Sequence, residues 1–141
     1  MSENSNVLIK KIFNQTKTIA ILGLSGRETQ PSHIVAKYLK EVGFQIIPVN
    51  PALDEVLGET CYASLKDIPI AVDVVNCFRA PQHIPAIVDE AIRIGAKTIW
   101  MQLGIEEPDA AEKARSRGLD VIQNLCIKIE HQHNTMTTLK N

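Results

Sequence analysis

The sequence is poor in aromatic residues and cysteine, has almost no net charge and contains no long apolar run. Only 4% of its 141 residues are aromatic, so aliphatic side chains must build the core. The formal net charge is −1, and without a basic run we expect no nucleic-acid partner. No apolar stretch approaches the roughly 20 residues that cross a bilayer, and the N-terminus lacks a signal-peptide pattern. We therefore expect a cytoplasmic protein without a membrane partner.

The three cysteines are too few and too widely spaced for two common uses of this residue. Cys61, Cys77 and Cys126 fit neither a disulfide framework nor a metal-binding knuckle. We therefore expect reduced thiols. We expect no metal site either, because two histidines in a polar tail, His131 and His133, usually do not ligate a metal.

What the sequence does contain is a regular alternation of apolar runs and helical patterns. Helical patterns begin near Ser32 and occupy about Ile84–Ile94 and Pro108–Arg117, with one helical turn at Ser64–Ile68. The alternation predicts an α/β domain with a Rossmann-like, doubly wound, five-stranded, mostly parallel sheet and helices on both faces. The predicted strands are Thr18–Leu24, Gln45–Val49, Val72–Phe78, Lys97–Leu103 and Leu119–Asn124.

Length and pattern divide the chain into three parts. Residues 1–16 hold a short amphipathic helix, at about Val7–Asn14, which we expect to pack on the domain. Residues 17–131 form the domain itself. Residues 132–141 are polar and predict a flexible tail.

The loop after the first strand has the composition of a phosphate-binding loop. Gly23 and Gly26 allow the backbone to approach a ligand, and the N-terminus of the following helix favours an anion. Leu24 lies within this loop, Ser25 can add a hydroxyl group and Arg27 a charge. The alternative is a tight strand-to-helix turn with exposed polar residues.

The dinucleotide fingerprint is incomplete, which counts against NAD. Position 25 is serine where that fingerprint has its second glycine, and the second strand ends in Asn50-Pro51 rather than in an acidic residue. An aspartate or glutamate normally holds the ribose diol there. A different nucleotide is therefore favoured, although Asn50-Pro51 can also be only a turn.

Other candidate residues follow the ends of the third and fourth strands. Arg79, after Phe78, can reach a phosphate or close a pocket at the carboxyl edge, where such sheets bind ligands. Trp100 and Gln102 share one face by the period of two. We expect Trp100 in the core and Gln102 in contact with a ligand.

No catalytic constellation can be assigned from the sequence. His33, in the first turn of the helix after the loop, is either a pocket residue or a solvated one. His83 is expected to be an exposed residue at a helix start. An enzyme would need a base or a nucleophile at the pocket, and His33 or Cys126 would be the candidates.

Several short motifs follow one another along the chain. They are ILGLSGR at 21–27, PSHIVAKYL at 31–39, PVNP at 48–51, LGETCYASLKDIP at 57–69, VDVVNCFR at 72–79, GAKTIWMQLGI at 95–105 and GLDVIQNLCIKIEH at 118–131. In this order they resemble the motifs of the small stand-alone CoA-binding proteins related to the N-terminal CoA-binding domain of the succinyl-CoA synthetase alpha subunit. The resemblance covers about residues 17–131, and the shared order and spacing of the motifs make it specific.

The resemblance implies a Rossmann-like fold that binds coenzyme A. It implies that the Gly23–Arg27 loop holds the pyrophosphate, that Phe78-Arg79 lies by the adenosine, and that Gln102 and Gly104 sit on the pocket rim. The residues expected to bind the cofactor are Gly23, Leu24, Ser25, Gly26, Arg27, Ser32, His33, Asn50, Pro51, Phe78, Arg79, Gln102 and Gly104. Gln30 stands where many relatives have a basic residue, and Asn124-Leu125 where many have Asp-Arg.

Three functions remain open at this point. The first is non-catalytic or regulatory binding of coenzyme A, or of an acyl-CoA, since the family's stand-alone members imply no established catalytic activity. The second is an NAD(P)- or acyl-CoA-dependent enzyme. The third is an interaction domain that has lost ligand binding. A protein partner and a homodimer both stay open.

Overall fold

The computed structural model describes residues 6–140, with side chains described as far as residue 135. Its centre is a five-stranded sheet in the order β2-β1-β5-β6-β7, and every pair of neighbouring strands is parallel. The predicted Rossmann-like α/β class is confirmed. The strands are β1 (Thr18–Leu22), β2 (Gln45–Val49), β5 (Val74–Cys77), β6 (Thr98–Met101) and β7 (Asp120–Ile122).

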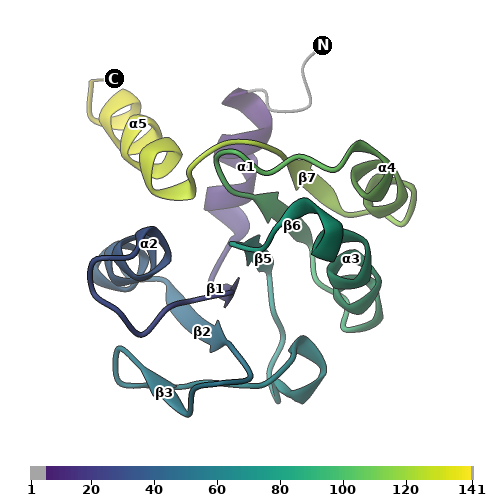
Figure 1. Cartoon of the computed structure of the whole chain (residues 1–141). Helices are drawn as coiled ribbons and strands as arrows, with labels where there is room; N and C mark the ends of the chain where they lie inside the picture. Colours follow the sequence, from purple (N-terminus) through teal and green to yellow (C-terminus); the bar gives the residue numbers. More distant parts are fainter. Residues whose placement is uncertain (1–5, 141) are drawn as a thin grey trace.

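The five helices cover both faces of the sheet (Figure 1). Helices α3 (Ile84–Arg93) and α4 (Pro108–Ser116) pack on one face, against strand residues such as Ala20 and Val75. Helices α1 (Asn6–Gln15), α2 (Pro31–Glu41) and α5 (Ile127–Lys140) cover the other face, where Ile19 and Trp100 are buried. The expected position of Trp100 in the core is confirmed.

Several predicted strands extend past the observed ones by one or two residues. The apolar run continues beyond the ladder at these ends because residues just outside it, such as Val72, are buried as well. Burial therefore marks the strands of a covered parallel sheet but does not mark where their pairing stops.

The segment between β2 and β5 contains a small hairpin that the sequence did not predict. Strands β3 (Glu55–Val56) and β4 (Glu59–Thr60) pair antiparallel. The predicted turn at Ser64–Ile68 is found as the 3₁₀ turn η1 (Leu65–Asp67). A second 3₁₀ turn, η2 (Pro81–His83), precedes α3.

Residues 132–140 of the predicted polar tail continue α5, and the flexibility of the tail stays a prediction. The start of this helix is held by β6. The indole Nε1–H of Trp100 donates to the Leu125 carbonyl oxygen at 2.9 Å, and the Gln102 side-chain oxygen accepts from the Ile127 N–H at 3.0 Å. Residue 141 of the predicted tail and residues 1–5 of the predicted N-terminal part lie outside the described residues.

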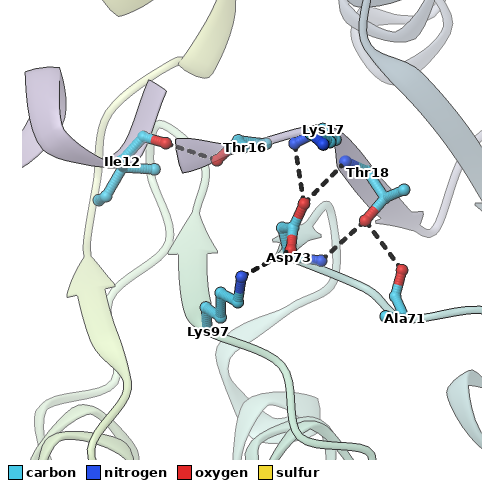
Figure 2. A network of polar contacts seen from close by, with 7 residues as sticks. All are labelled: Ile12, Thr16, Lys17, Thr18, Ala71, Asp73 and Lys97. Atoms are coloured by element: carbon cyan, nitrogen blue, oxygen red, sulfur yellow. Dashed lines mark hydrogen bonds and ion pairs between the residues drawn. The ribbon is translucent and has the colours of Figure 1, made fainter. Parts of the chain in front are cut away.

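A network of polar contacts ties the start of β1 to the start of β5 (Figure 2). The Asp73 carboxylate accepts from the N–H groups of Lys17 and Thr18 at 2.8 and 3.1 Å, and it pairs with Lys97 at 3.4 Å. The Thr18 hydroxyl donates to the Ala71 carbonyl oxygen and accepts from the Asp73 N–H. These contacts fix the amino-terminal edge of the sheet, opposite the edge where ligands bind in such folds.

Candidate functional site

A cleft of about 210 Å³ lies at the carboxyl ends of β2, β1 and β5. The chain leaves β1 toward β2 on one side and returns to β5 on the other, so this is the point where the strand order reverses. The cleft is lined by Leu22, Gly23, Val49, Pro51, Ala63, Ser64, Leu65, Arg79, His83, Ala86, Ile87 and Glu90.

Gly23 joins this cleft to the predicted phosphate loop. Its φ is +80°, in the left-handed region that favours glycine, and its N–H donates to the Val49 carbonyl oxygen at 3.1 Å. A Cβ at this position would collide with the carbonyl oxygen of Phe78. Only glycine therefore lets β1 turn away this close to the end of β5.

The loop is shaped from inside by Ser25, Ser32 and His33. The N–H of Ser25 donates to the Ser32 hydroxyl at 2.9 Å, and the Ser25 hydroxyl accepts from the Arg27 N–H at 3.0 Å. The His33 Nδ1 lies 3.0 Å from the Ser25 carbonyl oxygen. Since a carbonyl oxygen can only accept, this nitrogen carries the proton. His33 is thus neither solvated nor free as a base at this nitrogen.

These bonds leave a small set of donors facing solvent. Gly26 and Arg27 are exposed, whereas Leu24 is buried. Within the described part of the chain, the N–H of Gly26 has no hydrogen-bond acceptor, and α2 begins without a side-chain cap. An exposed N–H, an uncapped helix start and an arginine together form an arrangement that can bind an anion.

Asn50 braces the loop with its side-chain amide. Its Nδ2 donates to the Leu24 carbonyl oxygen at 3.0 Å, and its Oδ1 accepts from the Ala52 N–H at 2.9 Å. Its neighbour Pro51 lines the cleft. Asn50 as a ligand contact stays a prediction, with a structural role already visible.

The structure separates the two residues of the Phe78-Arg79 pair. Phe78 packs against the apolar cluster under α2 and α5, whereas Arg79 lines the cleft and is half-buried.

Gln102 and Gly104 are not brought to the cleft. Gln102 is buried and holds the Ile127 N–H, as described above. The N–H of Gly104 donates to the Asn124 side-chain oxygen at 2.6 Å. They follow β6, on the far side of β5 from the cleft, and their contact with a ligand stays a prediction.

The three cysteines are free thiols in different surroundings. Burial raises the pKa of Cys77 to about 12, so this thiol is not a nucleophile near neutral pH. Burial also raises the pKa of Cys61, whose thiol contacts the Asn50 carbonyl oxygen at 3.5 Å. Cys126 is half-buried and directly precedes α5.

Sequence reasoning missed part of the cleft wall. His83 is exposed, as predicted, but it also lines the cleft with Glu90 of α3. Ser64 approaches from the segment after the hairpin. No pattern links residues so far apart in sequence, and only the crossover connections bring them to one edge of the sheet.

Comparisons with known proteins found a matching family and similar chains. The family described as CoA binding domain matches residues 17–132. The protein YneT of Bacillus subtilis is 39% identical over 131 residues, covering 93% of this chain and 97% of YneT. A solved structure of a hypothetical protein from Pyrococcus horikoshii has 37% identity and a TM-score of 0.89, covering 93% of this chain and 92% of its own.

The match extends to a part of larger proteins. Acetate–CoA ligase (ADP-forming) II of Archaeoglobus fulgidus is 30% identical over 117 residues, covering 80% of this chain but only 17% of the ligase. The chain therefore spans less than a fifth of that ligase. None of the described helices is long and apolar enough to cross a membrane.

Proposed function

The chain belongs to the CoA binding domain family, and from that premise we propose that it binds coenzyme A or an acyl-CoA at the carboxyl edge of its sheet. The observation that carries the proposal is the junction at Gly23, where the phosphate loop opens directly into the cleft at the strand-order reversal. A nucleotide laid across this junction has its phosphates on the loop and its base in the cleft.

The pyrophosphate would lie on the loop. The exposed N–H of Gly26, the uncapped start of α2 and the exposed Arg27 supply positive potential at one place. The absence of an acceptor for the Gly26 N–H among the described residues leaves it available to a phosphate oxygen.

The adenosine end would lie in the cleft. Val49, Leu65 and Ile87 give it apolar walls. Its volume of about 210 Å³ is smaller than a site that encloses a whole drug-sized ligand. This volume suits one end of the cofactor, with the pantetheine arm outside.

Binding without catalysis is the form of the function that we propose. Neither His33 nor Cys126, the candidate base and nucleophile, lines the cleft. The ligase named among the relatives carries out its reaction with a chain several times longer.

Isothermal titration calorimetry with coenzyme A tests the proposal. We expect saturable binding with a single site per chain, and a rise in melting temperature that grows with ligand concentration, because a ligand bound only to the folded state stabilises it. Adenosine, which lacks the pyrophosphate, serves as the control and should bind far more weakly. Absence of heat and of any melting shift at millimolar coenzyme A would remove the proposal.

A further inference from the structure

Arg79 places a positive charge in the cleft without forming an ion pair there. Arg79 is half-buried, and its guanidinium has no hydrogen bond or ion pair among the described residues. Its Cδ lies 3.0 Å from the place that a Cβ on Gly23 would take, so the side chain crosses the junction of loop and cleft. By contrast, ion pairs with carboxylates are formed by Lys11, Lys40, Lys97 and Lys113.

The other charged groups of the cleft form no ion pair with Arg79. Glu90 lies on the α3 wall, where its carboxylate accepts from the Lys66 N–H at 3.4 Å, and it forms no ion pair with Arg79. His83 adds an imidazole from η2, on the same wall as Glu90. A partly desolvated guanidinium favours an anionic ligand, and its planar donors suit the oxygens of a phosphate.

The end of β2 indicates which phosphate this is. In dinucleotide-binding sheets an acidic residue there holds the free ribose diol, whereas an arginine nearby accommodates the 2′-phosphate of NADP. Here the position is Asn50, and its amide is already bonded to Leu24 and Ala52. The ribose of the proposed ligand therefore meets no acid at this strand end, and the guanidinium of Arg79 stands across β1, just after the end of β5.

From these contacts we infer that Arg79 binds the 3′-phosphate on the ribose of coenzyme A and makes the site select ligands with a phosphorylated ribose. This inference rests on the proposed function. The pyrophosphate has separate donors at Gly26 and Arg27, on the α2 side of the junction. The two anionic groups of the ligand are thus held by two arginines from different strand ends.

Calorimetry with coenzyme A and with 3′-dephospho-coenzyme A tests the inference. The protein should prefer coenzyme A by at least about tenfold, the effect of one charged hydrogen-bonded contact. Arg79→Met keeps the aliphatic stem over Gly23 and should abolish this preference, leaving the affinity for 3′-dephospho-coenzyme A within about twofold. Arg79→Lys should retain part of the preference, because the charge remains without the planar donors.

Two matched variants separate the roles. Arg27→Met should weaken the binding of both ligands by the same factor, since both carry the pyrophosphate. Arg117→Met, at the amino-terminal edge of the sheet, should change neither. As a control for folding, the melting temperature of Arg79→Lys without ligand should match that of the wild type.

The outcomes distinguish failure of the inference from failure of the proposed function. Equal affinity of the wild type for the two ligands would overturn the inference and leave the proposed function standing. An equal loss of affinity for both ligands in Arg79→Met would also overturn the inference, and it would assign Arg79 to the pyrophosphate. If neither ligand binds to the wild type, the proposed function fails, and the inference fails with it.

Discussion

At the scale of single residues, the two glycines of the loop have different physical duties. Gly23 has a left-handed backbone and no room for a Cβ against Phe78. Gly26 lies outside the left-handed region, and a Cβ there would make only an ordinary contact with Leu53 at 3.6 Å. Gly23 is thus required for the fold of the junction. Gly26 is required only if a ligand approaches the loop backbone from solvent.

The pair Gly23→Ala and Gly26→Ala separates stability from binding. Gly23→Ala should lower the free energy of unfolding by about 2–4 kcal/mol, from backbone strain and the collision with Phe78. Gly26→Ala should leave urea denaturation unchanged within about 0.5 kcal/mol and weaken coenzyme A binding at least about tenfold. Full affinity in a folded Gly26→Ala variant would show that no ligand approaches this backbone.

The residues of the site could be predicted only in part. The composition of the loop led to Gly23, Gly26 and Arg27, and the end of the third predicted strand led to Arg79, because both are local features of the sequence. The structural bonds of Ser32, His33 and Asn50 could not be foreseen. A polar residue beside a loop can face the ligand or the loop backbone, and the sequence pattern is the same in both cases.

At the scale of elements, α5 is the helix that the sequence did not predict. From residue 132 onward its sequence is polar and shows no continuous apolar stripe, so the sequence predicted a tail there. Individual contacts hold it instead. His131 lies among the rings of Phe13, Tyr38 and Phe44, at centroid distances of 5.1, 5.6 and 5.4 Å, and its Nδ1 lies 2.6 Å from the Tyr38 hydroxyl. Such specific contacts leave no periodic trace in a sequence.

The packing of α5 should depend on the protonation of His131. Burial lowers the pKa of His131, so the folded state favours the neutral ring. The contribution of His131 to the free energy of unfolding is therefore complete above the ordinary histidine pKa of about 6.5. It is lost as the pH falls through the lower pKa of the folded state. The protection factors of the α5 amides, which are corrected for the intrinsic exchange rate, should fall between pH 7 and pH 5.

A matched variant isolates this residue. His131→Phe keeps an aromatic ring among Phe13, Tyr38 and Phe44 and removes the titrating group. Its α5 amides should show the same protection at pH 7 and pH 5, after correction for the intrinsic rate. If the variant kept the pH dependence of the wild type, another group would be responsible.

At the scale of the whole molecule, the two edges of the sheet have different chemistry. The Asp73 network ties the strands together at the amino-terminal edge (Figure 2), whereas the carboxyl edge holds the cleft and Arg79, which forms no ion pair among the described residues. The alternation of strands and helices predicted that the loops after the strands lie at one edge of the sheet, because parallel strands all end at the same edge. What it could not predict was the hairpin β3–β4, whose short strands carry no periodic signal.

Because of the Asp73 network, the free energy of unfolding should decrease at acidic pH. Desolvation raises the pKa of Asp73, but the N–H groups of Lys17 and Thr18 and the charge of Lys97 outweigh it, and the net pKa is lowered. The stabilisation is therefore present above the ordinary value of about 3.9 and is lost as the pH falls through the folded value.

Urea denaturation of Asp73→Asn checks this expectation. At pH 7 the variant should be less stable than the wild type by about 1–3 kcal/mol, because an amide replaces a charged acceptor. At pH 3 the difference should shrink, since the wild-type carboxyl is becoming protonated. A difference that is the same at both pH values would contradict the account.

The central claim is that coenzyme A binds at the carboxyl edge of the sheet, across Gly23. The most direct test is a titration followed by two-dimensional ¹⁵N–¹H NMR of the assigned protein. Coenzyme A should shift the amides of Gly23, Gly26 and Arg79 in a saturable way and leave those of Lys97 and Asp120, at the amino-terminal edge, unchanged. Saturable shifts confined to the amino-terminal edge, or no shifts at millimolar coenzyme A, would contradict the claim.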